Sequence, residues 1–284
     1  MNGTIFEESI CGIQINHACR DSRFRMDTRH MHDEYEIYYL VSGERYYFIG
    51  EQTYLIKAGG LALINRNEIH KTGQVKSAVH ERILLSLSET PISDFTGYTD
   101  EFSLEDFFAA VNRGIQLSQK QSHLVEMRLR EILDIACSKE SGYKLMLLSK
   151  TTELLLFLQK LLLRDIPAKK TAPQSEKHKK VNEITIYLSQ HFKEPISLND
   201  AANKFFLNKS YLSRIFKEIT GFTVTEYINT RRIQEARKKL TNTTHSITKI
   251  SESVGYDSIT YFERVFKNHC RMTPVEYRNS MASK

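Results

Sequence analysis

The sequence predicts an α+β protein with two domains: a β-rich first half completed by helices, and an all-α second half. Three observations predict this division. Short segments that alternate apolar and polar residues, separated by glycine, occupy roughly residues 20–90, whereas apolar residues recur at helical spacing from residue 104 onward. One pattern also occurs twice near the end of the chain. With 284 residues, the chain is long enough for two domains that each bury a core.

Charge is divided unevenly between the two halves. Residues 174–284 hold 19 Lys and Arg against 11 Asp and Glu, whereas residues 1–173 hold 21 against 23. A basic excess confined to the second half indicates a polyanionic partner there. The four cysteines lack metal-binding spacing, so we expect reduced thiols. Because neither a leader nor a membrane span is evident, we expect a cytoplasmic protein without a membrane partner.

The β-rich part is expected to form a small barrel or sandwich. Its strands are expected at 35–41, 44–49, 52–56, 61–65 and 79–87. Several short strands at close spacing, punctuated by glycine, are typical of small barrels whose interior can hold a ligand.

Polar residues gather before and within the first of these strands. His30, His32 and Glu36 all have even numbers, so an unbroken extended chain would turn them to the same side, together with Tyr38. With His70 farther along the chain, the set resembles the histidine and glutamate ligands of the cupin barrel. We therefore expect these side chains to lie close together in a cupin-like domain.

The cupin resemblance leaves two interpretations open. Three imidazoles and a carboxylate would suit a divalent transition metal with open positions, as in a metal-dependent enzyme. Alternatively, the same groups line a pocket for a small-molecule effector, and Tyr38, Arg45 and Tyr47 then help to shape it. The second half of the cupin pattern is altered, since Arg66 and Asn67 stand where a proline and a glycine are expected.

Helices are expected over 104–114, 118–137 and 142–163. The third is more apolar than one barrel face requires, so we expect part of it to bury against a second copy of the chain in a homodimer. The apolar character of this helix comes from Leu145, Leu148, Leu154, Leu155, Leu158 and Leu162.

A charged segment separates the two domains. Residues 164–180 contain Pro167, Pro173 and many charges but almost nothing to bury, which predicts a linker. We therefore expect the first domain to span 1–163 and the second to span 181–284.

The second domain contains an internal repeat. The identical pairs are Tyr211/Tyr261, Arg214/Arg264, Phe216/Phe266, Lys217/Lys267, Thr223/Thr273, Glu226/Glu276, Tyr227/Tyr277 and Asn229/Asn279. Within each copy the apolar residues fall on one face of a short helix, and basic and polar residues occupy the other face. The repeat therefore predicts two similar amphipathic helices.

Each of these helices is expected to follow a shorter one. In the first copy, a helix over Leu198–Lys204 leads through a turn to Asn208, a favourable N-cap for the longer helix. The second copy repeats the arrangement after Gly255, with Asp257 or Ser258 as the N-cap. A short helix, a turn and a longer basic helix make a helix-turn-helix motif.

A helix over Val224–Leu240 is expected to join the two copies. Its seventeen residues at 1.5 Å each span roughly 26 Å. A rigid spacer of that order could hold two recognition helices near the ~34 Å that separates successive major grooves on one face of DNA.

These stretches resemble the AraC-type family of bacterial transcriptional regulators. The resemblance lies in SYLSRIFK at 210–217, in GYDSITYFERVFK at 255–267 and in TPVEYR at 273–278. It covers about the last hundred residues, while the first half looks more loosely like the effector-binding and dimerisation domain of the family. The resemblance implies double-stranded DNA as a partner, a small-molecule effector, and RNA polymerase if the protein is an activator.

The exposed starts of the two longer helices supply the candidate DNA contacts. In the first copy these are Lys209, Ser210, Ser213 and Arg214, with Lys217 one turn farther along. In the second copy they are Ile259, Thr260, Glu263 and Arg264, with Lys267 one turn farther along. The aromatic pair Tyr211 and Tyr261 is expected in the core or against the DNA backbone.

The side-chain types at these positions suggest roles. Arg214 can bond guanine O6 and N7 with two hydrogen bonds, Glu263 could accept from cytosine N4, and Ile259 could meet a thymine methyl group. Lys217 and Lys267 are better placed for phosphate. The sequence thus predicts an effector-controlled transcriptional regulator without catalytic residues, metal or other cofactor, and the alternative is a metal-dependent cupin enzyme with an appended DNA-binding module.

Overall fold

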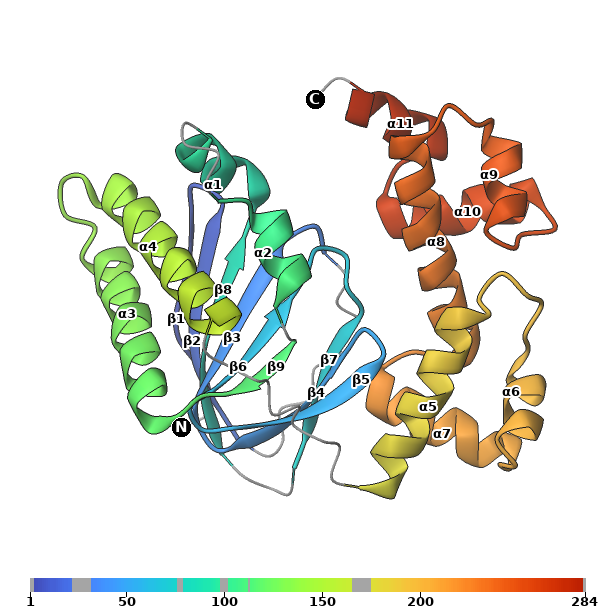
Figure 1. Cartoon of the computed structure of the whole chain (residues 1–284), viewed down its shortest axis with the longest axis horizontal. Coiled ribbons are helices and arrows are strands. Elements are labelled where there is room, and N and C mark those ends of the chain that lie inside the picture. The colour runs from blue at the N-terminus through green and yellow to red at the C-terminus, as the bar shows by residue number, and fades with distance from the viewer. Residues whose placement is uncertain are drawn as a thin grey trace. The chain divides into compact units, whose positions relative to one another are not determined.

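The computed structural model describes residues 3–21, 32–75, 79–97, 102–111, 113–164 and 175–282. The chain forms two compact units, Met1–Gln174 and Ser175–Lys284, which Figure 1 shows with their helices and strands labelled. The elements of the first unit are β1 (Gly3–Ile10), β2 (Ile13–Arg20), β3 (Tyr35–Ser42), β4 (Glu44–Ile49), β5 (Gln52–Lys57), β6 (Gly60–Ile64), β7 (His70–Gln74), β8 (His80–Leu87), α1 (Glu89–Thr96), α2 (Leu104–Ala110), β9 (Gly114–Gln116), α3 (Gln119–Ser138) and α4 (Tyr143–Arg164).

The described strands of the first unit form two antiparallel sheets. One sheet has the order β1-β2-β8-β3-β6-β9 and the other the order β5-β4-β7. The predicted β-rich, cupin-like domain is therefore confirmed. Between the described strands, the hydrogen bonds make a two-sheet arrangement and not one closed barrel.

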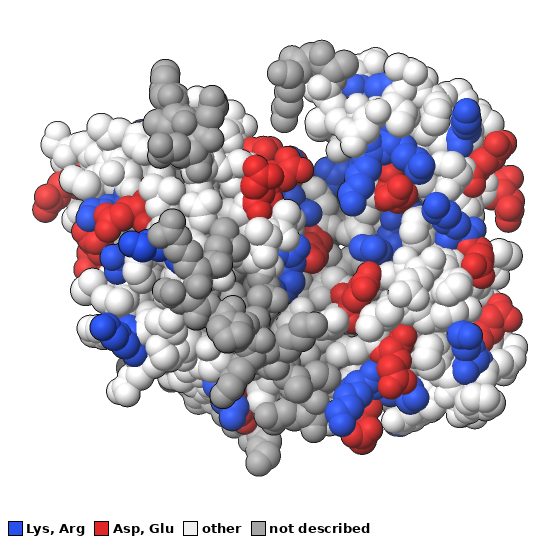
Figure 2. Space-filling model, in the orientation of Figure 1, with Lys and Arg blue, Asp and Glu red and all other residues white. Residues whose placement is uncertain are grey.

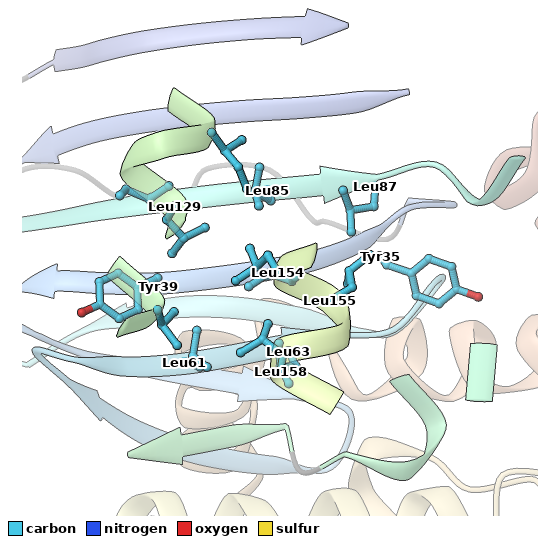
Figure 3. Close-up of a cluster of buried hydrophobic side chains, with 14 of the residues drawn as sticks. Tyr35, Tyr39, Leu61, Leu63, Leu85, Leu87, Leu129, Leu154, Leu155 and Leu158 are labelled. Atoms are coloured by element: carbon cyan, nitrogen blue, oxygen red, sulfur yellow. The ribbon is translucent and has the colours of Figure 1, made fainter. Parts of the chain in front are cut away.

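Strand β3 shows how the larger sheet is buried on both faces. Its odd-numbered residues Tyr35, Ile37 and Tyr39 belong to the large apolar core, which α3 and α4 cover. Figure 3 shows Leu129 of α3 and three leucines of α4 packed over this face. The even-numbered Tyr38 and Leu40 face a second cluster with Tyr47 of β4. Alternation of side chains along a strand thus separates the helix-covered core from the interior between the sheets.

Several elements of the first unit differ from the sequence prediction. Strands β1 and β2 lie within residues 3–20, ahead of the predicted β-rich stretch, and the sequence analysis predicts neither β7 nor α1. The expected helix over 104–114 ends at Ala110, and β9 follows it. Gly114 permits this strand because a Cβ atom there would lie 2.5 Å from the ring of Tyr54. A strand of three residues is too short to show an alternating pattern. Its partner β6 is also distant in sequence, so no local signal indicates the pairing.

Helices α3 and α4 lie close to their predicted bounds. Ser118 caps α3 and exchanges hydrogen bonds with Gln121, which fixes the helix start. Most of the α4 leucines pack inside their own unit, as Leu154, Leu155 and Leu158 do. A buried leucine contributes about 1.5–3 kcal/mol of apolar transfer free energy, so intramolecular packing accounts for much of the apolar character of α4.

The second unit is entirely helical among its described residues, 175–282. Its elements are α5 (Glu176–Gln190), α6 (Leu198–Lys204), α7 (Lys209–Thr220), α8 (Val224–Asn242), α9 (Ile247–Ser253), α10 (Ile259–Cys270) and α11 (Pro274–Ala282). Helix α8 runs between α5–α7 at one end and α9–α11 at the other (Figure 1). No described helix of either unit combines the length and apolar character needed to cross a bilayer.

The start of α5 corrects the predicted linker. Residues 176–180 were assigned to a linker, but they form the beginning of α5. The hydroxyl of Ser175 caps the helix by accepting from the backbone N–H of His178. Ion pairs of Lys179 with Glu176 (2.7 Å) and Lys180 with Glu183 (2.8 Å) then follow the helical i,i+3 spacing. The lysine run is therefore part of a charged helix.

The sequence repeat is also a structural repeat. The ring of Phe216 meets that of Tyr227 at 5.6 Å, and Phe266 meets Tyr277 at the same centroid distance, both nearly perpendicular. Thr223 caps α8 in a reciprocal pair with Glu226. Thr273 and Glu276 make the same hydrogen bonds at the start of α11. The identities between the copies thus preserve packing and helix caps.

Candidate nucleic-acid interface and ligand site

Helix α7 presents the first set of predicted contact residues. The side-chain oxygen of Asn208 caps it by accepting from the N–H groups of Ser210 and Tyr211, at 2.9 and 3.3 Å. Its buried face packs into the unit and consists of Leu212, Ile215, Phe216 and Ile219. The opposite face leaves Lys209, Ser210, Arg214 and Lys217 exposed and Ser213 half-buried. All five predicted residues therefore belong to one helix with its N-terminus at the surface.

Helix α10 presents the second set. Ser258, one of the two predicted caps, accepts from the N–H of Tyr261 at 3.3 Å. The side chains of Phe262, Val265 and Phe266 are buried. Those of the five predicted contact residues are exposed, namely Ile259, Thr260, Glu263, Arg264 and Lys267. An exposed isoleucine at the start of a helix is available for an apolar contact with a partner.

The repeated tyrosines are not core residues. Tyr211 and Tyr261 are 40% and 38% exposed, so the core alternative is wrong, and contact with the DNA backbone stays a prediction. Each lies against the arginine three residues later: Arg214 is 5.7 Å from the Tyr211 ring centre, and Arg264 is 5.2 Å from that of Tyr261. An arginine on an aromatic ring gains a cation–π contact and loses side-chain freedom before it meets a partner.

Other arginines of this unit serve its own structure. Arg232 donates to the carbonyls of Phe192 and Glu194, at 2.7 and 2.9 Å. Arg237 donates to the hydroxyl of Tyr277 at 2.9 Å. Both side chains are half-buried in these contacts. Arg232 and Arg237 therefore tie the helices of the unit together and are poor candidates for base contacts.

Charges of both signs lie on the face of the second unit that Figure 2 shows. On the face that Figure 2 shows, blue Lys and Arg side chains of this unit lie among red Asp and Glu side chains. The contact candidates are consequently identified by their place on α7 and α10 and not by one large basic patch on that face.

The nineteen residues of α8 span roughly 28 Å at 1.5 Å each, comparable with the ~34 Å between successive major grooves.

In the first unit, three of the four residues that resemble cupin ligands come together. His32 Nε2 lies 3.0 Å from Glu36 Oε1, and His70 Nε2 lies 3.5 Å from Glu36 Oε2. The ligand atoms of all three residues lie within 4.8 Å of one another. Ser86 donates to Glu36 at 3.4 Å from the neighbouring strand. The fourth residue, His30, lies outside the described residues.

The altered cupin positions hold this cluster in place. Arg66 makes two hydrogen bonds to the carboxylate of Asp33, at 3.1 and 2.8 Å. Asn67 has a left-handed backbone with φ of 56°, and its N–H donates to the carbonyl of His32 at 2.8 Å. Asparagine tolerates this conformation better than most residues, so it can take the place of the expected glycine. The turn thereby anchors the segment that carries His32 beside Glu36.

The cluster of His32, Glu36 and His70 could hold either an extra proton on an imidazole or a metal ion. Burial lowers the pKa of His32, but its hydrogen bond and charge interaction with Glu36 outweigh burial and raise that pKa above its ordinary value. A metal would need both imidazoles neutral. His70 is oriented for a ligand role, because its Nδ1 donates to the Glu68 carbonyl at 2.9 Å, as metal-binding histidines commonly do, and its Nε2 faces Glu36. His32 instead favours the proton.

The remaining predicted pocket residues line the interior between the sheets. Tyr38, Arg45 and Tyr47 are each no more than 2% exposed. The rings of Tyr38 and Tyr47 meet edge to face at 5.1 Å. Burial raises the pKa of both tyrosines, which keeps their hydroxyls protonated as hydrogen-bond donors. Arg45 is thus buried on the same side of β4 as Tyr47, and its part in binding an effector stays a prediction.

Two further polar residues of this interior were missed from the sequence. His80 is 2% exposed, and Arg82 on the same strand is half-buried with its guanidinium 5.9 Å from the Tyr38 ring centre. Both have the even parity of Leu84 and Ser86 on β8. That parity is the one signal that could have identified them, because a charged residue on a strand is usually exposed.

Comparison with known proteins gives one consistent result. Residues 15–153 match the model of the AraC-like ligand binding domain, and residues 201–280 match that of a helix-turn-helix domain. The uncharacterized HTH-type transcriptional regulator YfiF of Bacillus subtilis is 26% identical over 88% of this chain and 78% of its own length. The HTH-type transcriptional activator RhaR of Mannheimia succiniciproducens is 28% identical over 90% and 88%.

Comparison with solved structures gives both partial and nearly full-length matches. ToxT from Vibrio cholerae covers 94% of this chain and 98% of its own, with a TM-score of 0.36 and 15% identity. The DNA-binding domain of AdpA, solved in complex with a target DNA, covers 36% of this chain and 91% of its own, with a TM-score of 0.35 and 19% identity.

Proposed function

The chain belongs to the AraC-type family of transcriptional regulators, and from this premise we propose that it binds specific DNA through α7 and α10 under the control of a small molecule held between the sheets of its first unit. The observation that carries the DNA-binding proposal is the pair of equivalent helices with capped, surface-exposed N-termini. A helix presented in this way can enter the major groove with its first residues at the base edges.

The two helices are proposed to contact unlike sequences. At equivalent positions, Lys209 and Ser213 of α7 correspond to Ile259 and Glu263 of α10. A cation and a hydroxyl favour hydrogen-bond acceptors on DNA, whereas an isoleucine favours a thymine methyl group and a carboxylate accepts from cytosine. One copy of the chain therefore recognises an asymmetric site with two different elements.

Binding by the full chain to duplex DNA tests the proposed function. Fluorescence anisotropy on a pool of random duplexes, with unlabelled competitor DNA at several salt concentrations, separates specific from general binding. We expect a specific complex whose affinity falls steeply with salt, since phosphate contacts release counterions. Binding that stays equal for all sequences at every salt concentration would contradict the proposal.

A homodimer through α3 and α4 is part of the proposal. Leu145 and Leu156 of α4 lie three helical turns apart on one side and remain exposed, and Met127 of α3 is exposed as well. Large apolar side chains left at the surface of neighbouring helices support an interface between copies. Analytical ultracentrifugation should give a dimer for the wild type and a monomer for Leu156→Glu. Glu153→Gln, an exposed change one turn away, is the matched control.

An activating role in the cytoplasm, with RNA polymerase as a further partner, completes the proposal. Support comes from a relative described as a transcriptional activator, which matches most of this chain. In a transcription assay, the wild type should raise synthesis from a promoter with its site beside the polymerase site. Lower synthesis in the presence of the protein would indicate a repressor.

A metal-dependent cupin enzyme is the second candidate function, and His70 favours it. Its Nδ1 is bonded to a backbone carbonyl and its Nε2 faces Glu36, an orientation that suits a ligand. We propose the regulator without enzymatic activity because relatives described as transcriptional regulators match about 90% of the chain. Elemental analysis of protein purified without chelator distinguishes the two: stoichiometric zinc, iron or manganese, lost in Glu36→Gln, would support the enzyme.

A further inference from the structure

The interior between the sheets has two chemically different ends. At one end, the carboxylate of Glu36 is accompanied by His32 and His70. At the other end lie Arg45 and Arg82. The strand registers separate the ends by four residues: on β8 from Ser86, which pairs with Glu36, to Arg82, and on β4 from Ile49, which pairs with His70, to Arg45. Four residues of strand span about 13 Å, so Glu36 is too distant to neutralise the arginines directly.

The cationic end is well defined by packing. A Cβ atom on Gly43, in the turn between β3 and β4, would lie 3.0 Å from the Cβ of His80. The turn that leads to Arg45 therefore packs directly on His80. Arg82 lies opposite Leu40 of β3 and points to the same side as Tyr38. Two arginines, a histidine and a tyrosine thus converge on one region.

Four buried polar atoms of this region lack hydrogen-bond partners among the described residues. Arg45 Nε, Arg82 Nη1, His80 Nδ1 and Tyr38 Oη are buried without a hydrogen bond, and no ion pair is formed there by either arginine with a described carboxylate. A buried cation without a partner is strongly unfavourable, and native proteins rarely leave buried polar groups unsatisfied.

The local electrostatics agree with a missing anion. Burial lowers the pKa of Arg45, and the charge of Arg82 lowers it further. Burial also lowers the pKa of His80 to about 4, with the charges of Arg45 and Arg82 contributing. His80 is therefore neutral at physiological pH and adds no charge, whereas each arginine keeps its own. The region therefore carries two positive charges, and a bound anion would offset the cost of burying them.

We propose that the effector is a small molecule with an anionic group, a carboxylate or a phosphate, bound by Arg45 and Arg82 with Tyr38 as a hydroxyl donor. The inference rests on the proposed function for the statement that a small molecule occupies this interior. Arginine suits the role because its planar guanidinium bonds carboxylate and phosphate with two parallel hydrogen bonds. Tyr47 and the residues around Glu36 would contact the remaining part of the effector.

The stability of the full chain tests the inference. Because the chain has no tryptophan, unfolding is followed by circular dichroism at constant ionic strength set with chloride. The probes are succinate with its neutral analogue succinamide, and glucose 6-phosphate with glucose. The variants are Arg45→Met and Arg82→Met, and Arg130→Met on the outer side of α3 is the matched control.

Arg45→Met should unfold at a higher temperature than the wild type without probe, since it removes an unpaired buried charge. An anionic probe should raise the wild-type midpoint by about 5 °C or more near 100 times its Kd, while its neutral analogue does not. Both arginine variants should lose this rise, and Arg130→Met should keep it. A response to succinate alone assigns a carboxylate, and a response to glucose 6-phosphate alone assigns a phosphate.

Two results would overturn the inference. One is an Arg45→Met midpoint at or below that of the wild type, combined with no response of the wild type to either anion. The other is equal stabilisation of the wild type and Arg45→Met by the anions. Specific DNA binding by the same wild-type sample is measured in parallel. If it persists while the anion response fails, only this inference falls; if it is absent while the anion response holds, the proposed function falls.

Discussion

Arg214 lies over Tyr211 on the exposed side of α7, with its guanidinium 5.7 Å from the centre of the ring. Arg264 and Tyr261 repeat the contact on α10 at 5.2 Å. The repeat therefore preserves an oriented arginine at the same place on both helices, although the neighbouring side chains differ. A side chain that is already oriented loses less conformational entropy when it bonds a base.

Replacement of Arg214 should affect specificity more than general affinity. Arg214→Ala should weaken binding to the preferred site by about 1–3 kcal/mol and relax the preference at one base pair. Lys217→Ala, by contrast, should weaken binding to all sequences and reduce the salt dependence by about one charge. Competition binding on single-base variants of the site distinguishes the two. A uniform loss in Arg214→Ala would reassign this residue to phosphate.

Gly255 is expected to be irreplaceable in the turn before α10. Its φ is +95°, and a Cβ atom there would lie 2.4 Å from the carbonyl oxygen of Lys193. Gly255→Ala should therefore destabilise the second unit by more than about 2 kcal/mol. Gly142→Ala is the control, because its φ is also positive at +83° but nothing lies within 4 Å. It should cost about 1 kcal/mol. Similar urea midpoints for the two variants would contradict this account of the turn.

The buried His80 predicts a loss of stability in mild acid. Its pKa is about 4 in the folded protein, below the ordinary value of 6.5, so the unfolded chain takes up the proton first as pH falls. The first unit should lose up to about 3 kcal/mol from this residue as the pH falls from 6.5 through 4. His80→Gln should show a shallower dependence in urea unfolding at each pH. Identical pH profiles would mean that His80 titrates normally.

The helical unit could be predicted from local signals. Asn208 caps α7 as expected from the sequence, Ser197 caps α6, and the apolar spacing of α8 is visible within one window. The first unit was harder, because β9 pairs with β6 about fifty residues away and its three residues carry no pattern of their own. Local chemistry therefore defines helix ends, whereas short strands depend on distant partners.

In the candidate sites, too, local sequence patterns located some residues, whereas contacts between the two sheets could not be predicted. The parity of β3 correctly placed Glu36 and Tyr38 on one side, and the repeat located α7 and α10. The cationic end of the interior was missed because Arg45 comes from one sheet and Arg82 from the other. Each alone resembles an ordinary charged residue on a strand. Only the packing of the two sheets shows that both lie in the same interior.

The most direct test of two unlike recognition helices is the DNA sequence that the full chain selects from a random duplex library. We predict that each copy of the chain selects two different elements, with centres about one helical turn apart. Glu263→Ser, which gives α10 the residue found at the equivalent Ser213 of α7, should change the preference within one element only. Two identical elements, or a change in both elements on Glu263→Ser, would contradict the account.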